Sequence, residues 1–316
     1  MATMRAMAVE RFGGPDELRE MQLDAPLVGP DYVLIRIAAA GVNPVDSMIR
    51  AGGLTGAFPH MLPVIPGWEA AGTVEAVGPA VTSVAPGDRV VAYCRKDLVQ
   101  GGTYAELVAA RDTAVAGAGS MDLIAAGGLP LAGLTAYQLL HDAVGIRTGE
   151  TIVVRGASGG VGHFAVQLAH AAGADVIAVA GGGAEVVVHA LGAGDFVDYR
   201  TEDVAGAIRA LAPDGADVLV DTAGGDLAAL APAVRDGGRM ASILVTEPPE
   251  SAAERGIGFR YVFVRPNGHQ LSELVAMADA GHLRVAIDTT YPLAQAPAAQ
   301  ALLAEGGVRG KLILEI

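Results

Sequence analysis

Short apolar segments separated by glycine and proline turns dominate the first third of the chain. Strands are predicted over Met4–Val9, Tyr32–Ala39, Ala71–Val77 and Arg89–Ala92. Gly78-Pro79 and Gly87-Asp88 have the composition of turns between such strands. Many short strands with turns of this kind predict a small, partly open β-barrel.

The pattern changes at Leu129–Leu140, which predicts a helix, and from Thr151 onward strands alternate with helices. The predicted strands are Thr151–Arg155, Asp175–Ala180, Asp195–Tyr199, Asp217–Asp221, Arg239–Leu244 and Phe259–Val264. Helices such as Gly162–Ala172 and Val204–Ala212 lie between them. Apolar strands separated by helices indicate an α/β fold with a doubly wound parallel sheet.

The tail returns to mixed elements that are too few for a third domain. It predicts a helix at Leu271–Ala280, a strand at Leu283–Ile287, a helix at Ala296–Ala304 and a strand at Lys311–Ile316. We therefore expect a β-rich domain from residues 1–125, completed by residues 266–316. Residues 126–265 would form the α/β domain.

Composition narrows the classes of partner. Hydrophobic residues make up 52% and charged residues 18% of 316 residues, which is enough for a large core. The net charge of −14 argues against nucleic acid or a membrane surface as partner. Cys94 is the single cysteine, no apolar run approaches the roughly 20 residues of a membrane span, and no signal peptide is recognisable. We expect a soluble, cytoplasmic protein.

The clearest chemical signal follows the strand Thr151–Arg155, where a glycine loop leads into a helix. The loop residues expected to hold a cofactor are Gly156, Ser158, Gly159, Gly160, Val161 and Gly162. A strand, a glycine loop and a helix in this order aim backbone N–H groups at a pyrophosphate, as in dinucleotide-binding proteins. The alternative is an ordinary glycine-rich turn that binds nothing.

The residue that would select between NAD and NADP is missing from its usual place. After the second strand of this region the chain reads Val179-Ala-Gly181-Gly-Gly-Ala-Glu185, and no basic residue follows until Arg200. An acidic residue at this place would bind the ribose of NAD, and a basic one the 2′-phosphate of NADP. The expected cofactor is NADPH, with NADH not excluded.

A set of short motifs spans nearly the whole chain. They are Gly41-Val-Asn43-Pro44-Val-Asp46, Pro63-Val-Ile-Pro66-Gly67-Trp68-Glu69-Ala-Ala-Gly72, Gly87-Asp88-Arg89-Val90, Gly102-Thr-Tyr104-Ala105-Glu106, Leu134-Thr135-Ala136-Tyr137, the glycine loop, Leu191-Gly192-Ala193, Gly237-Gly238-Arg239 and Arg309-Gly310-Lys311-Leu312. With these motifs the chain resembles the medium-chain dehydrogenase/reductase superfamily, in its zinc-independent quinone oxidoreductase (zeta-crystallin-like) branch. The resemblance implies a GroES-like β-rich domain wrapped around a Rossmann domain, an active site in the cleft between them, and a homodimer.

The resemblance also indicates which reaction to expect. Zinc-dependent relatives carry Cys where this chain has Asn43 and His where it has Trp68, and neither amide nor indole replaces those ligands. No metal is therefore expected. A quinone or enone is electrophilic without a Lewis acid, whereas an isolated ketone usually needs one. The expected function is an NAD(P)H-dependent oxidoreductase acting on such a small conjugated carbonyl compound.

Individual roles follow from the resemblance, each with a structural alternative. The catalytic candidates are Asn43, Asp46 and Thr135, of which Asn43 and Thr135 are also expected to contact the cofactor. The substrate candidates are Trp68, Leu54 and Phe263. The further cofactor candidates are Gly181, Tyr199, Leu244 and Val245. Asn43 and Asp46 could also form an Asn-Pro turn, with Asp46 capping a short helix at Ser47, and this role is compatible with one beside the cofactor. Thr135 could be a packing residue, Trp68 a filler of the vacated zinc pocket, and Lys311 a structural strand lysine.

No proton donor stands out. Enoyl-reducing relatives often have a tyrosine shortly after the Asn-x-x-Asp motif, where this chain reads Arg50-Ala-Gly-Gly-Leu54-Thr55 with Leu54 directly after the glycines. Two other functions stay open at this point. One is a biosynthetic reductase or cyclase that acts on one tailored intermediate, and the other is a non-catalytic, crystallin-like binding or structural protein.

Overall fold

The computed structural model describes residues 2–316 and divides them into two compact units. Residues up to Leu134 together with Arg265–Ile316 form the β-rich unit, and Thr135–Val264 form the second unit. The domain limits expected from the sequence, 125 and 266, stay a prediction. No helix among residues 2–316 has the length and apolar character that crossing a bilayer requires.

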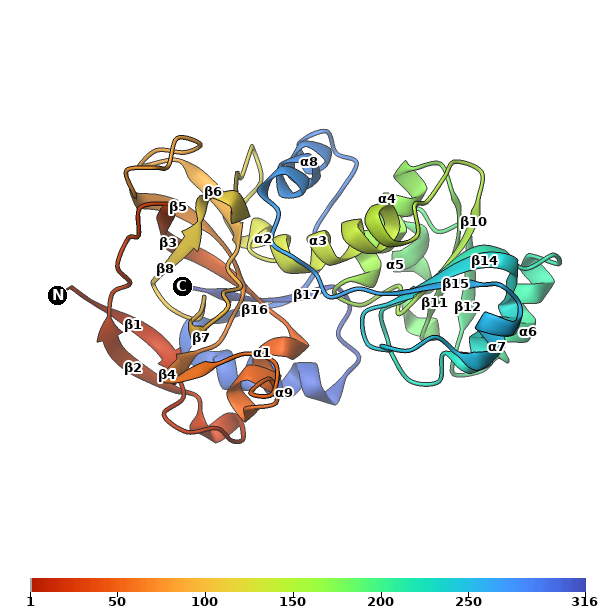
Figure 1. Ribbon diagram of the computed structural model, residues 1–316, viewed down its shortest axis with the longest axis horizontal. Coiled ribbons are helices and arrows are strands. Elements are labelled where there is room, and N and C mark those ends of the chain that lie inside the picture. Colours follow the sequence, from red (N-terminus) through yellow and green to blue (C-terminus); the bar gives the residue numbers. More distant parts are fainter. Residues whose placement is uncertain (1) are drawn as a thin grey trace. The chain divides into compact units, whose positions relative to one another are not determined.

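A large sheet organises the β-rich unit (Figure 1). Its strand order is β16 (Ile287–Pro292), β17 (Lys311–Glu315), β3 (Tyr32–Val42), β5 (Glu69–Val77), β6 (Arg89–Tyr93) and β9 (Val115–Gly117), and β8 (Leu107–Arg111) also pairs with β3. Two small sheets join β1 (Thr3–Ala8) to β2 (Arg19–Asp24) and β4 (His60–Ile65) to β7 (Val99–Gly101). The helices are α1 (Pro44–Ala51), α2 (Leu123–Ala126), α8 (Gly268–Asp279) and α9 (Ala296–Glu305), while α3 spans Pro130–Tyr137.

The long strand β3 brings the two ends of the chain together. Its second half pairs antiparallel with β17, with Val42 opposite Leu312, and its first half pairs with β8. Its other edge pairs with β5, where a side chain at Gly72 would come within 2.0 Å of the Arg36 carbonyl oxygen. Glycine is therefore required at this close approach of two backbones.

The second unit is built on a parallel sheet. Its order is β12 (Asp195–Asp198), β11 (Asp175–Ala180), β10 (Thr151–Arg155), β13 (Ala216–Asp221), β14 (Val234–Ser242) and β15 (Gly258–Tyr261). The connecting helices are α4 (Gly162–Ala171), α5 (Glu185–His189), α6 (Val204–Leu211) and α7 (Glu250–Glu254). The chain starts in the middle at β10, moves outward to β12, and then resumes at β13 on the other side. This confirms the predicted doubly wound fold, whose loops diverge between β10 and β13.

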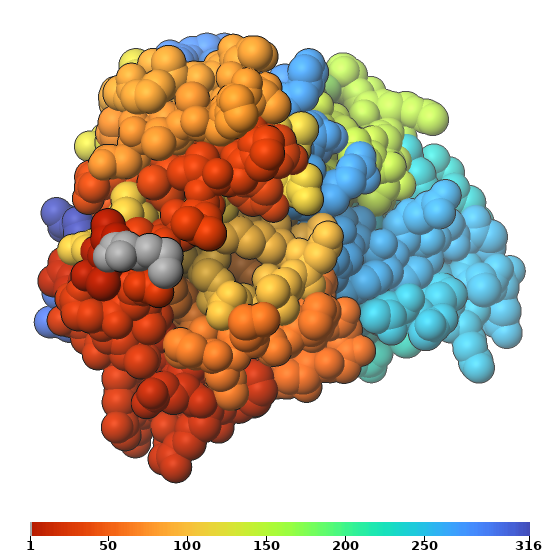
Figure 2. Space-filling view, turned by 60° about the vertical axis from the view of Figure 1, so that its left-hand side comes forward, coloured from red at the N-terminus to blue at the C-terminus, as the bar shows by residue number. Residues whose placement is uncertain are grey.

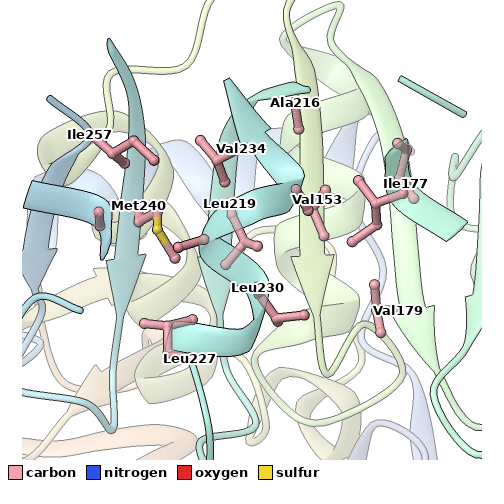
Figure 3. Close-up of a cluster of buried hydrophobic side chains, with 14 of the residues drawn as sticks. Val153, Ile177, Val179, Ala216, Leu219, Leu227, Leu230, Val234, Met240 and Ile257 are labelled. Carbon is pink, nitrogen blue, oxygen red and sulfur yellow. The ribbon is translucent and has the colours of Figure 1, made fainter. Parts of the chain in front are cut away.

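A row of apolar side chains crosses four strands of this sheet at one level (Figure 3). Val153 lies opposite Ile177 on one side and Leu219 on the other, and Leu219 lies opposite Met240. All four are buried. Because aligned residues of a parallel sheet point to the same face, this row forms the floor of a continuous core.

The structure corrects two sequence-based element boundaries. The predicted strand Leu283–Ile287 is wrong, because the strand β16 begins only at Ile287, and Leu283 is a buried residue of the preceding loop. The strand escaped prediction because its sequence, Ile-Asp-Thr-Thr-Tyr-Pro, is polar and largely exposed, as suits an edge strand. The predicted helix Leu129–Leu140 begins at Pro130 and changes from α3 into a π-helical segment, Gln138–Ala143.

Leu219→Ala tests the core row. Leu219 is fully buried, so truncation should lower the free energy of unfolding by about 2–5 kcal/mol, the usual cost of lost transfer energy plus a cavity. The matched control is Val186→Ala, whose side chain is 82% exposed and whose truncation should cost within about 0.5 kcal/mol. Denaturant unfolding measures both; equal losses in the two variants would contradict this placement of the core.

Candidate functional site

The glycine loop turns at the carboxyl end of β10. Gly156 has a φ of +78°, and a side chain there would meet the Thr222 hydroxyl at 2.6 Å. A side chain at Gly162 would approach the Gly156 carbonyl oxygen to 2.0 Å. The first glycine thus permits the turn, and the last lets α4 begin directly against it.

The loop leaves a group of backbone donors free. The N–H groups of Ser158, Gly160, Val161 and Gly162 make no hydrogen bond to any residue of the described chain, 2–316. Helix α4 starts at Gly162 without a side-chain cap. Uncapped helix N–H groups and the positive end of the helix dipole attract an anion. The loop therefore fits the pyrophosphate of a dinucleotide.

One buried carboxylate, Asp221 at the end of β13, holds the neighbouring loops. Its Oδ1 accepts hydrogen bonds from the backbone N–H groups of Ala223 at 3.2 Å and Gly224 at 3.1 Å, and lies 3.4 Å from the Arg155 guanidinium. Its Oδ2 accepts from the Ser242 hydroxyl at 2.8 Å. Asp221 thus links the ends of β10, β13 and β14, the edge at which doubly wound proteins bind ligands.

Ser242 extends this arrangement to the predicted cofactor residues Leu244 and Val245. Its hydroxyl oxygen accepts from their backbone N–H groups, at 3.1 Å and 2.9 Å. Leu244 is 57% exposed. Phe263, the predicted substrate residue that follows β15, is 46% exposed.

The strand β11 ends beside a basic residue, Arg200, which is distant from it in the sequence. A side chain at Gly181 would lie 3.2 Å from the Arg200 Nε atom, so the guanidinium covers this glycine. Arg200 also contacts the exposed Tyr199, whose hydroxyl it meets at 3.3 Å. Hydrogen bonding to Tyr199 raises the pKa of Arg200. Arg200 follows β12, so the pairing of β11 with β12 brings it beside Gly181 at the end of β11.

A buried ion pair lies at the centre of the β-rich unit. The Lys311 Nζ atom is 2.7 Å from the Glu69 Oε1 atom and donates to the Asn43 Oδ1 atom at 2.6 Å and the Val42 carbonyl at 3.3 Å. Asn43 Nδ2 donates to Glu69 Oε1 at 2.7 Å. The other Glu69 oxygen accepts from the Leu131 N–H at 2.7 Å. Each buried charge thus has a counter-charge and further hydrogen bonds, as burial demands.

Asn43 and Asp46 form a turn at the start of α1. The Asp46 Oδ2 atom accepts from the Asn43 N–H at 2.8 Å and from the Tyr104 hydroxyl at 3.0 Å. Asp46 is fully buried, and this burial raises its pKa to about 7. The helix begins at Pro44 with Asn43 as its N-cap, so the alternative in which Asp46 caps a helix that starts at Ser47 is wrong in that detail. The proline at the first helical position fixes the earlier start, because its φ suits a helix.

The predicted substrate residue Trp68 belongs to an aromatic cluster. Its ring meets Phe58 edge-on at 5.9 Å and Tyr93 at 6.5 Å between centroids. The Phe58 N–H donates to the carbonyl of Leu54, another predicted substrate residue, which is buried. Trp68, Phe58 and Leu54 thus come together within the β-rich unit. Thr135 is buried in α3, and its assigned role stays a prediction.

The positions at which relatives bind zinc do not fit a metal. Both polar atoms of the Asn43 side chain are engaged, and the Lys311 ammonium already occupies the space next to its oxygen. Trp68 offers no metal-binding atom, because its indole N–H is only a donor. Within residues 2–316, no three side chains among His, Cys, Asp and Glu gather in a way that would hold a metal ion.

The chain matches two known family models and is similar to known oxidoreductases. Residues 29–120 match the model of the alcohol dehydrogenase GroES-like domain, and residues 191–314 match that of a zinc-binding dehydrogenase domain. The quinone oxidoreductase of Sus scrofa is 33% identical over 98% of this chain and 97% of its own. An Arabidopsis thaliana NADPH-dependent alkenal/one oxidoreductase is 31% identical over 98% of this chain and 79% of its own.

A solved structure gives the same result at the level of fold. The quinone oxidoreductase from Coxiella burnetii superposes with a TM-score of 0.90 and 28% sequence identity, and the match covers 100% of both chains. The similarity in sequence and the similarity in fold therefore both extend over nearly the whole chain.

The buried Asp46 predicts a specific dependence of stability on pH. Its folded pKa of about 7 lies above the roughly 3.9 of an unfolded aspartate, so the folded state holds the proton longer. Stability must then fall as pH rises from about 4 to about 7. Asp46→Asn removes this titratable carboxyl group. Between pH 5 and 8 the wild type should lose on the order of 2 kcal/mol more unfolding free energy than the variant; parallel curves would contradict the assignment.

The Lys311–Glu69 pair predicts a non-additive pair of substitutions. Lys311→Met leaves Glu69 buried without its counter-charge and should cost about 3–5 kcal/mol of unfolding free energy. The double variant Lys311→Met with Glu69→Gln should be more stable than Lys311→Met alone, because no uncompensated charge remains. Additive losses in denaturant unfolding would show that the two groups do not stabilise each other.

Proposed function

Because the chain belongs to the zinc-independent quinone oxidoreductase branch of the medium-chain dehydrogenase/reductase superfamily, we propose that it transfers hydride from NADPH to a quinone or enone. The observation that carries the proposal is the set of free backbone N–H groups on the glycine loop at the uncapped start of α4. They suit a pyrophosphate, and the loop lies where doubly wound folds bind dinucleotides. The relatives' names favour this reading over a tailored cyclase or a non-catalytic protein.

The substrate class follows from the side chains available. When bound, a reduced nicotinamide supplies the hydride. No zinc ligand set exists at Asn43 and Trp68, so the chain offers no Lewis acid there to polarise an isolated carbonyl. A conjugated carbonyl compound accepts hydride at carbon and spreads the charge onto its oxygen, so positioning and hydrogen bonds suffice. A small flat quinone or enone meets that condition.

The residue roles remain proposals. Asn43 would act beside the nicotinamide, with its amide held in one orientation by Lys311 and Glu69. Asp46 would support that turn from its buried position. Thr135 would contact the nicotinamide side of the cofactor. Trp68, Leu54 and Phe263 would form apolar walls for the substrate.

NADPH is the proposed cofactor because of Arg200. Its exposed guanidinium covers Gly181, at the place where NADP-binding proteins carry a basic residue. A guanidinium pairs with a phosphate through two parallel hydrogen bonds, which ribose hydroxyls cannot offer. Tyr199, beside Arg200, would line the adenosine. A homodimer and a cytoplasmic location, expected from the sequence, are further parts of this proposal; light scattering tests the first and cell fractionation the second.

The central experiment combines cofactor binding, turnover and metal analysis. The purified protein should bind NADPH and oxidise it with a simple quinone or an enone, and elemental analysis should find well under one zinc per chain. Gly162→Ala should weaken NADPH binding by about tenfold or more, because the new methyl group would displace the loop. The matched control is Gly14→Ala, where a side chain meets nothing within 4 Å. Absence of dinucleotide binding would refute the proposed function.

Arg200→Met tests the cofactor preference. Loss of a charge-assisted contact with the 2′-phosphate should raise the KM for NADPH by about tenfold and leave that for NADH nearly unchanged. The control is Arg209→Met, an exposed arginine on α6. Steady-state kinetics with both cofactors gives the ratio, and an equal change for NADPH and NADH would assign Arg200 no part in selecting the phosphate.

A further inference from the structure

The β-rich unit contains a cavity of about 930 Å³ that the proposed reaction does not use. It opens because β1 and β8 separate. The segment before β8 meets β1 at one bridge, Ala6 with Ala105, after which β1 pairs with β2 and β8 pairs only with β3 among the described strands. Met4 and the whole of β8 then face the same space. Figure 2 shows this face of the unit, hollowed between N-terminal segments in red with yellow segments at its floor.

The lining combines an apolar surface with a few charged groups. Apolar side chains come from β1, β2 and β8 and include Met4, Leu23 and Leu107. Leu27 lies on the lining and is 81% exposed. The acidic Asp24 and Asp97 also line the cavity but are exposed to solvent. This volume and this mixture suit a small molecule with an apolar body.

Lys96 is one of the charged residues that line the cavity. Its half-buried ammonium donates one hydrogen bond, to the Gly101 carbonyl at 3.0 Å, and has no carboxylate partner among residues 2–316. Burial lowers the pKa of Lys96. Arg95 and Arg111 line the same cavity, although Arg111 pairs with Asp31 at 2.9 Å. In a chain of net charge −14, a partly buried ammonium without a counter-ion favours an anion.

Tyr93 connects the cavity to a natural reporter. It lines the cavity, is fully buried, and its hydroxyl has no hydrogen-bond partner in the described chain. Its ring also meets Trp68 edge-on. Trp68 is the single tryptophan of the chain. A ligand that moves Tyr93 should therefore change the fluorescence of Trp68.

We propose that this cavity is a second binding site, separate from the dinucleotide loop, for a small amphipathic anion. The apolar body would lie along β8 and β1, and the anionic head would bind the Lys96 ammonium. A carboxylate and a phosphate monoester share this head-group chemistry. The inference does not rest on the proposed function, since the cavity lining includes none of Asn43, Asp46, Leu54 and Trp68 and the binding involves no step of hydride transfer.

The test is a titration of the whole protein with decanoate below its micelle concentration, followed by Trp68 fluorescence and by calorimetry. Saturable binding is expected. Decanol, which lacks the charge, and decyltrimethylammonium, which reverses it, should bind at least tenfold more weakly. Decyl phosphate shows which head group the site prefers, and tighter binding of either anion supports the proposal. Equal affinity for decanoate and decanol would overturn it, as would no saturable binding of either anion.

Two variants locate the site. Lys96→Met keeps the apolar stem and removes the charge, so decanoate binding should weaken by about tenfold or more. Leu27→Glu adds a negative charge at an exposed lining position, where folding should be unaffected, and should also weaken binding. The control is Val186→Glu, equally exposed at 82% but in the other unit. Unchanged affinity in Lys96→Met and Leu27→Glu would place the ligand elsewhere and overturn the proposal. NADPH binding should be unaffected throughout, so failure here leaves the proposed function untouched.

Discussion

A buried charge needs a partner, and in the β-rich unit this requirement determines which segments of the chain meet around Lys311 and Glu69. The Lys311 ammonium and the Glu69 carboxylate are both almost fully buried, and either alone would be strongly destabilising. The pair is completed by the Asn43 amide and the Leu131 N–H. These groups come from the last strand, from β5, from the turn before α1 and from the start of α3. One ion pair therefore joins segments that lie far apart in the chain.

The second unit uses its buried carboxylate for a different purpose. Asp221 holds the loops that follow β10, β13 and β14, directly and through Ser242. The neighbouring glycine loop keeps several N–H groups free, although most buried backbone donors in proteins are paired. Free donors can bind a phosphate without first breaking hydrogen bonds within the protein. The loops held by Asp221 and the unpaired N–H groups of the glycine loop lie at the same edge of the sheet, and together they form a surface that suits an anionic ligand.

The sequence predicted the parts of this structure that depend on local pattern. The glycine loop, the doubly wound order and the family could be recognised because strand periodicity and short motifs reveal them. The partners of Lys311 could not, since Glu69 is 242 positions away and only the pairing of β17 with β3 brings them together. Arg200 reaches Gly181 for the same reason, through a neighbouring strand. The strand β16 escaped because its residues are polar at an exposed edge.

The place of β17 has a consequence for how the chain folds as it is synthesised. Residues 135–264 form a compact unit made of consecutive segments, so they can fold as soon as they leave the ribosome. The β-rich unit contains residues from both ends and its central cation arrives only with Lys311. Until then Glu69 must remain exposed to water or unpaired. The N-terminal part of this protein is therefore translated first and becomes complete last, after the middle of the chain already has its own core.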